Sequence, residues 1–240
     1  MMLKKWNDLP EEMRIDEVRP YYEALRKKRV ALFFKRAFDV VVSLIMLVVL
    51  SPVFLILAIA IKLDSKGPVF YRQTRITQYG KKFKIFKFRT MVQNADKIGA
   101  QVTVNNDARI TRVGKLIRRC RLDEICQLID VLRGTMTFVG TRPEVEKYVA
   151  RYSPEMLATL LLPAGVTAES SIYYKDEDRL LDGADNVDDI YVNKVLPGKM
   201  YYNLKAIKSF GFWKDIKIMF MTVFAVLGKE YVGDYVPPKE

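Results

Sequence analysis

A single uncharged run dominates the hydropathy pattern of this chain. Residues 40–61 carry no charged side chain, and a membrane-spanning helix needs about 20 such residues. Ser51-Pro52 interrupts the run near its middle, where proline removes a backbone hydrogen bond and bends a helix. We therefore expect a helix bent at Ser51 and Pro52.

Basic residues flank this run on both sides: Arg26, Lys27, Lys28, Arg29, Lys35 and Arg36 before it, and Lys62, Lys66, Arg72 and Arg75 after it. Cationic flanks favour the cytoplasmic side of a membrane. A re-entrant helix that enters, bends and returns keeps both flanks there. A plain single span stays open on hydropathy alone, because prolines also occur in spanning helices.

Residues 1–34 are polar and charged, with a helix start around Asp8 and Pro10. They lack the small-residue cleavage site of a signal peptide. We expect a surface arm without chemistry.

Two short strands are predicted after the apolar run, at residues 69–71 and 83–88, with a turn at 78–82 that suits a β-hairpin. Alternation along the second strand puts Lys87 and Arg89 on the same side. They could clamp a phosphate or be ordinary solvated strand charges, and both interpretations stay open.

Residues 115–144 combine opposite charges at short range. Arg118, Arg119 and Arg121 run into Asp123-Glu124, and a helical apolar stripe follows as far as Leu132. Neighbouring residues on a helix diverge by about 100°, so the two carboxylates suit unequal roles unless the helix begins near them. An exposed helix with ordinary salt bridges is the alternative.

The remaining pattern is mostly helical, and the fold class we expect is α+β and mainly helical. Residues 163–167 are expected to form a turn or loop, and the acidic region 176–189 to form solvated caps and loops. A basic helix is expected at 194–210, apart from Pro197-Gly198. An amphipathic helix at 212–227 would pack in the core or lie at a membrane interface.

The amino-acid composition restricts the partners and the catalytic groups that are available to this chain. The net charge is +12, which favours anionic partners such as nucleic acid, a membrane face or phosphorylated molecules. The chain has no histidine, which excludes Ser-His-Asp and Cys-His nucleophiles and His-ligated zinc. Cys120 and Cys126 should face different sides of one predicted helix, as two reduced thiols on the cytoplasmic side of the membrane.

Several separated pieces together resemble the bacterial sugar transferases, the monotopic phosphoglycosyl transferases that act as undecaprenyl-phosphate sugar phosphotransferases. The resemblance covers about residues 33–228. The matching pieces are Lys35-Arg36-Ala37-Phe38-Asp39, Ser51-Pro52, Gly67-Pro68-Val69-Phe70, Lys87-Phe88-Arg89-Thr90-Met91, Leu122-Asp123-Glu124, Gln127-Leu128, Gly134, Phe138-Val139-Gly140-Thr141-Arg142-Pro143-Glu144 and Asp215-Ile216-Lys217-Ile218.

The resemblance implies transfer of a sugar-1-phosphate from a nucleoside diphosphate sugar, with uridine the expected nucleoside, to a polyprenyl phosphate. Asp123 would be the nucleophile, forming an aspartyl phospho-sugar intermediate, and Glu124 would assist. Both carboxylates would hold Mg²⁺, which takes carboxylates and substrate phosphates. Lys87, Arg89, Arg118 and Arg142 are the cations expected around the phosphates. The reaction would start polysaccharide or glycoconjugate synthesis at the cytoplasmic face of the inner membrane.

Three departures limit what can be carried over. Thr141 stands where the family often has proline, and Asp130 where many members have asparagine. Residues 163–169 replace a more usual Pro-Gly-Ile-Thr-Gly-Trp run, which puts the identity of the donor in doubt.

The expected organisation is an arm (1–34), a re-entrant membrane helix (35–64), a catalytic domain (65–230) and a tail (231–240), with a homodimer as an open alternative to a monomer. Two other functions stay in view. One is a non-catalytic, basic membrane-bound scaffold of the same fold. The other is a single-pass protein that binds nucleic acid, which the carboxylates among the cations disfavour because they repel phosphates.

Overall fold

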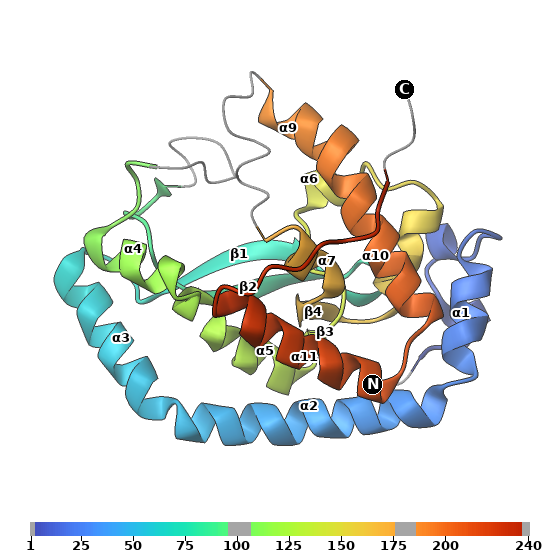
Figure 1. The fold of residues 1–240 in the computed structure, drawn as a ribbon, viewed down its shortest axis with the longest axis horizontal. Helices are drawn as coiled ribbons and strands as arrows, with labels where there is room; N and C mark the ends of the chain where they lie inside the picture. Colours follow the sequence, from blue (N-terminus) through green and yellow to red (C-terminus); the bar gives the residue numbers. More distant parts are fainter. Residues whose placement is uncertain (1–2, 96–106, 176–185, 237–240) are drawn as a thin grey trace.

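A bent pair of helices forms one long edge of the molecule (Figure 1). The computed structural model describes residues 3–95, 107–175 and 186–236. Helices α2 (Arg29–Val49) and α3 (Ser51–Asp64) meet with a bend of 60°. Pro52 lies in the first turn of α3, where its missing N–H is tolerated. The predicted bend at Ser51 and Pro52 is confirmed.

Within the described residues, no single helix has the length and hydropathy to cross a membrane, although α2 and α3 meet that test as a bent pair. The polar side of helix α2 faces the body and its apolar side is exposed. Lys35, Asp39 and Ser43, which recur at helical spacing, are buried. Its exposed face carries large apolar side chains, among them Val41, Leu44, Ile45, Val48 and Val49.

The predicted β-hairpin is confirmed. Strand β1 (Phe70–Ile76) pairs antiparallel with β2 (Lys82–Phe88), with Phe70 opposite Phe88 and Ile76 opposite Lys82. The turn η3 (Gln78–Gly80) has positive φ at Tyr79 (58°) and Gly80 (71°). Strand β1 extends well beyond residues 69–71, because its whole length pairs with β2.

A second, buried sheet was not predicted. Strands β3 (Met136–Val139) and β4 (Ala164–Thr167) run parallel, so the expected turn or loop at 163–167 is wrong. A strand covered on both faces shows no alternation of polar and apolar residues, which hid β4 in the sequence. A Cβ added at Gly165 would clash with the backbone of Gly140, so the close approach beside the sheet requires glycine there.

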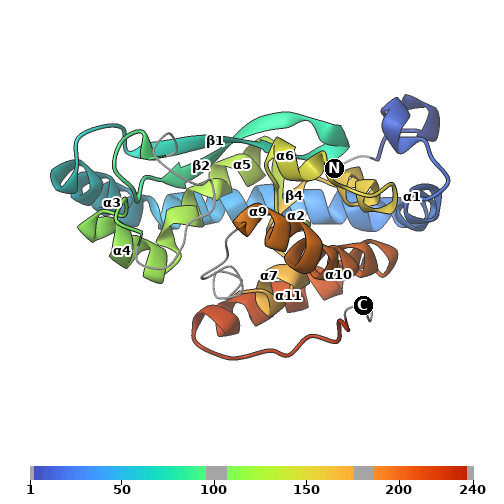
Figure 2. The same ribbon diagram turned by 90° about the horizontal axis from the view of Figure 1, so that it is seen from above.

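Short helices α6 (Glu146–Val149), η6 (Glu155–Leu161) and α7 (Glu169–Tyr173) lead to the C-terminal helices. These are α9 (Val187–Ile190), the π-turn η7 (Tyr191–Val195), α10 (Leu196–Lys208) and α11 (Phe212–Val226). Pro197 has no N–H to donate to the preceding turn. The π-turn directly before α10 accommodates this missing hydrogen bond, and the helix continues past the proline. Figure 2 shows the β-hairpin on one side of α2 and α10 with α11 on the other.

The N-terminal residues do not form the surface arm that was expected. Elements η2 (Glu11–Met13) and α1 (Arg19–Arg26) contribute buried side chains to one core cluster that also contains Tyr79, Leu161 and Phe210. Trp6 of η1 (Trp6–Asp8) packs against this cluster and is partly buried. Tyr79 Oη accepts a hydrogen bond from the Lys4 backbone N–H at 3.0 Å. The segment before the apolar run is therefore part of the body. Polar and acidic residues between the apolar ones concealed this in the sequence.

The described part of the expected tail also packs on the body. Lys205 Nζ on α10 donates to Asp234 Oδ2 at 2.5 Å, and the Tyr235 N–H donates to Tyr202 Oη at 2.7 Å. The overall class is α+β and mainly helical, as predicted.

Candidate active site

The acidic pair lies at the start of a new helix. Helix α4 (Arg112–Arg119) ends before Arg121, which is left-handed (φ 51°), and the 3₁₀ helix η5 (Leu122–Gln127) then begins. The single helix predicted through this region is thus broken, because a left-handed residue cannot continue it. Asp123 and Glu124 occupy the first turn of η5, where carboxylates interact favourably with the helix dipole.

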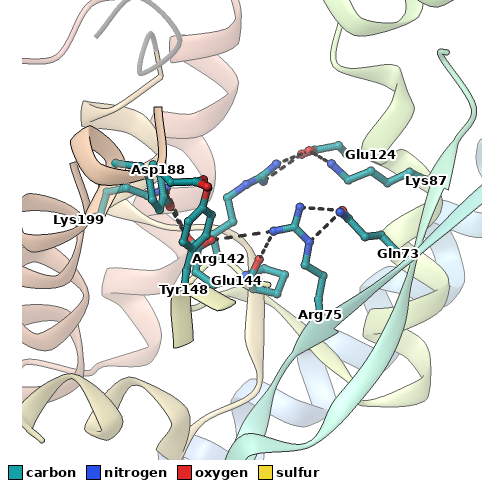
Figure 3. Close-up of polar contacts among 11 residues, drawn as sticks. Gln73, Arg75, Lys87, Glu124, Arg142, Glu144, Tyr148, Asp188 and Lys199 are labelled. Atoms are coloured by element: carbon teal, nitrogen blue, oxygen red, sulfur yellow. Dashed lines mark hydrogen bonds and ion pairs between the residues drawn. The ribbon is translucent and has the colours of Figure 1, made fainter. Parts of the chain in front are cut away.

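Glu124 is held between two cations from different elements (Figure 3). Lys87 Nζ on β2 donates to Glu124 Oε1 at 3.0 Å, and Arg142 donates to both carboxylate oxygens through its two Nη atoms. Burial alone would raise the pKa of Glu124. The charges and hydrogen bonds of Arg142 and Lys87 outweigh this effect and hold the pKa well below its usual value.

Asp123 has the opposite electrostatic setting. Its carboxylate forms no ion pair with any other described residue. Burial raises the pKa of Asp123, while Lys87 opposes the rise and Glu124 adds to it. The two carboxylates are therefore unequal, as the sequence predicted. Lys87 and Arg142 neutralise Glu124, whereas Asp123 has no such partner among the described residues, and separate roles for the two stay a prediction.

The four predicted phosphate-binding cations do not all gather at this site. Lys87 and Arg142 contact Glu124 directly. Arg118, in the last turn of α4, lies near enough for its charge to lower the pKa of Asp123. Arg89 instead donates to Ser65 O at 2.7 Å and Lys66 O at 2.8 Å, so it holds the turn after α3. Phosphate binding by Arg89 stays a prediction.

A second charged network supports the loop that carries Arg142. Arg75 Nη1 donates to Pro143 O at 3.2 Å and lies 3.9 Å from Glu144 Oε2. Glu144 is buried and accepts a hydrogen bond from Tyr191, while Lys199 Nζ lies 3.5 Å from its Oε1 (Figure 3). In the sequence, Arg75 is recognisable only as a cation that flanks the apolar run, and no local pattern distinguishes Lys199.

Asp130 and Gln127 lie just behind the site. The buried Asp130 carboxylate accepts a hydrogen bond from the Phe86 N–H at 2.8 Å, so it joins α5 (Leu128–Arg133) to β2. Burial raises the pKa of Asp130. Gln127 is buried, and its amide has no hydrogen-bond partner among the described residues. Its place in the motif with Leu128 was the only sequence signal for it.

The site suits a metal that needs few protein ligands. No group of three or more acidic or thiol side chains capable of holding a metal occurs in the described parts of the chain. Mg²⁺ is usually bound by one or two carboxylates, and waters and substrate phosphates complete its octahedron. Asp123 and Glu124 fit that donor set, provided that a bound phosphate draws Lys87 and Arg142 away from Glu124.

The bent pair α2 and α3 and the carboxylates flanked by cations agree with the resemblance found in the sequence. The chain belongs to the bacterial sugar transferase family, whose family model matches residues 30–229.

Characterised relatives agree with this assignment. The chain is 33% identical over 198 residues to the UDP-N-acetylgalactosamine-undecaprenyl-phosphate N-acetylgalactosaminephosphotransferase of Aeromonas hydrophila, covering 81% of this chain and 44% of the relative. It is 37% identical over 220 residues to the UDP-glucose:undecaprenyl-phosphate glucose-1-phosphate transferase of Escherichia coli, covering 89% of this chain and 44% of the relative. It thus spans less than half the length of either relative.

Proposed function

We propose that this chain transfers a sugar-1-phosphate from a uridine diphosphate sugar to a polyprenyl phosphate at the cytoplasmic face of the inner membrane. The observation that carries the proposal is the carboxylate of Asp123, which forms no ion pair with the described residues. Beside it lies Glu124, which Lys87 and Arg142 neutralise. The names of the relatives support the substrates, since they state UDP-sugar donors and undecaprenyl phosphate as the acceptor.

Asp123 acts as the nucleophile in this proposal. One carboxylate oxygen attacks the sugar-bearing phosphorus, the bond from that phosphorus to the bridging oxygen breaks, and the electron pair leaves with the nucleoside monophosphate. An oxygen of the polyprenyl phosphate then attacks the same phosphorus and frees Asp123. Burial of this carboxylate supports the role, because a poorly hydrated anion is a stronger nucleophile.

Lys87 and Arg142 make the approach of one anion to another feasible. Both donate to Glu124 in the structure, and the oxygens of a diphosphate compete with that carboxylate for the same donors. Arginine binds phosphate through paired N–H groups, and lysine supplies a compact charge. Mg²⁺, which Asp123 and Glu124 would hold, supplies further neutralisation of the diphosphate.

The membrane placement we propose is a re-entrant hairpin. Residues on both sides of the apolar run, such as Leu25 and Leu161, share one core cluster, which supports their lying on the same side of a membrane. The uncharged halves of α2 and α3 measure about 15 Å each at 1.5 Å per residue. Neither half alone is therefore long enough to cross a hydrocarbon core about 30 Å thick.

The test is a donor screen with the full chain in vesicles that contain polyprenyl phosphate and Mg²⁺. We expect transfer from one radiolabelled nucleotide sugar, and an adduct on the protein by intact-mass spectrometry when the acceptor is left out. Asp123→Asn should lose both the turnover and the adduct. Asp16→Asn, a matched change at an exposed carboxylate, should keep both.

Two results would count against the proposal. Turnover that survives in Asp123→Asn would exclude the covalent route. A wild-type chain that transfers nothing from any donor would favour the alternative, a non-catalytic membrane scaffold of the same fold.

A further inference from the structure

An open groove lies between α2 and α11, away from the carboxylates. Its volume is about 780 Å³, within the range of roughly 300–1,000 Å³ of small-molecule sites. Apolar residues of α2, such as Val30, Phe34 and Val41, form one wall, and Phe212 and Trp213 of α11 form the other. Lys27 and Lys28 lie at one end, and no acidic side chain from the described residues lines the groove.

The groove opens on the apolar face of α2. Because a helix turns about 100° per residue, Val30, Phe34, Val41 and Val48 lie within about 40° of one another around the axis. These four side chains are exposed, and the stripe they form leads from the basic end of the groove to the bend. The groove is thus continuous with the surface that we place in the bilayer.

The basic end suits an anionic head group at the membrane surface. Lys27 is exposed and forms no ion pair or hydrogen bond with its side chain to any described residue, while Lys28 donates to the Phe210 carbonyl. Trp213 is 79% exposed at the same groove, and exposed tryptophans favour the head-group level of a bilayer. A ligand that fits has a negative head and an apolar chain.

We propose that this groove binds an anionic phospholipid, with the lipid phosphate at Lys27 and Lys28 and one acyl chain along α2. The inference rests on the membrane placement proposed above. Lys27 and Lys28 precede residue 30, where the family match begins, so the basic end lies outside the part of the chain that defines the family.

The polyprenyl phosphate acceptor is a poorer occupant. Its phosphate must reach Asp123, which directly follows α4, whereas Lys27 directly precedes α2. Figure 1 shows α4 and the start of α2 at opposite ends of the molecule. A lipid phosphate at Lys27 is therefore remote from the reacting centre.

The test is native mass spectrometry of the full chain, extracted from phosphatidylcholine vesicles with and without phosphatidylglycerol. Wild type should retain one phosphatidylglycerol. Ala37→Trp, which fills the groove, should abolish retention, and Lys27→Gln should weaken it about five-fold, as expected for one lysine near an anionic surface. Val48→Trp, beyond the groove, and Lys5→Gln, an exposed lysine elsewhere, should retain the lipid.

Three outcomes would overturn the inference: equal retention of phosphatidylcholine, retention that is unaffected by Ala37→Trp, or displacement of the lipid by polyprenyl phosphate. Transferase turnover is measured on the same samples with added donor and acceptor. A chain that retains the lipid but lacks turnover contradicts the proposed function alone, and a chain that turns over without retaining the lipid contradicts this inference alone.

Discussion

Lys87 Nζ lies 3.0 Å from Glu124 Oε1, and this contact joins strand β2 to the first turn of η5. The side chains are 21% and 15% exposed, so solvent screens the pair only in part. The same ammonium group lowers the pKa of Asp123. Lys87 therefore lowers the pKa of both carboxylates.

Removal of this lysine should change the pH dependence of the reaction. Burial raises the pKa of Asp123, so the carboxylate becomes protonated at a higher pH than an ordinary aspartate. We therefore expect turnover to be lost, as the pH is lowered, at a pH above the usual pKa range of aspartate. Lys87→Met removes a cation that lowers this pKa, so the acid limb of kcat/KM against pH should move to higher pH. Lys84→Met, an exposed lysine on the same strand, should leave the limb in place. An unchanged limb in Lys87→Met would show that Asp123 does not set it.

The guanidinium of Arg142 should contribute through its paired donors. Arg142→Gln removes a fixed charge aimed at the phosphates, and we expect kcat/KM to fall about 10²–10³-fold. Arg142→Lys should recover only part of the loss, because one ammonium cannot reproduce the two-point contact with Glu124. Arg151→Gln, at an exposed position, is the matched control. Full activity in Arg142→Lys would reduce the role of Arg142 to charge alone.

The family residue at position 130 should make the fold more stable at neutral pH. Burial raises the pKa of Asp130 in the folded chain, so folding stability falls as pH rises from the unfolded pKa, about 3.9, through the folded one. Asp130→Asn keeps an acceptor for the Phe86 N–H and has no proton to lose. Its advantage in denaturation midpoint should grow across that window and be complete above the folded pKa.

Asp130→Leu supplies the contrast. It removes the acceptor for the Phe86 N–H and should cost about 1–3 kcal/mol of unfolding free energy at any pH. If the Asn and Asp chains kept the same difference in midpoint at acid and neutral pH, the titration argument would fail.

A buried ion pair should anchor helix α2 to the body. Lys35 Nζ on α2 lies 2.5 Å from Asp215 Oδ2 on α11 and also donates to Val139 O, with the Lys35 side chain only 4% exposed. Lys35→Met leaves a buried carboxylate without its partner and should cost about 3–5 kcal/mol. The double change Lys35→Met with Asp215→Leu should recover part of that cost. Thermal unfolding in detergent micelles measures both, with Lys62→Met at an exposed position as control.

Both sides of the apolar run should face the same compartment. Cys120 is exposed on the body and Cys126 is buried, so the wild-type chain carries one accessible thiol as a reporter. Lys5→Cys adds a second reporter in the N-terminal segment, and a membrane-impermeant maleimide should label both from the same side. Val48→Cys, near the bend, should resist the reagent. Labelling of Cys120 and of the thiol introduced by Lys5→Cys from opposite sides would exclude the re-entrant hairpin.

Local signals predicted several elements well. The bend at Ser51 and Pro52, the β-hairpin and α11 each depend on a proline, a turn or a periodicity within a few residues. Unequal roles of Asp123 and Glu124 stay a prediction, and the opposite shifts of their pKa values are consistent with it.

The features that the sequence did not predict depend on the backbone geometry of single residues and on contacts between distant segments. The left-handed Arg121 breaks a helix that periodicity predicted as continuous. Arg89 directly follows the expected strand, but its side chain donates to the Ser65 and Lys66 carbonyls. The parallel pairing of β3 with β4 and the support of the Arg142 loop by Arg75 bring together residues that share no local pattern.

The core cluster that joins Leu3 and Leu25 to Ile207 and Phe210 has a consequence for biogenesis. During synthesis the N-terminal residues emerge first, yet the partners that bury them are made near the end of the chain. On the re-entrant placement that we propose, α2 and α3 would meet the membrane while this core is still incomplete. The core could then close only after the chain has returned to the side from which it entered.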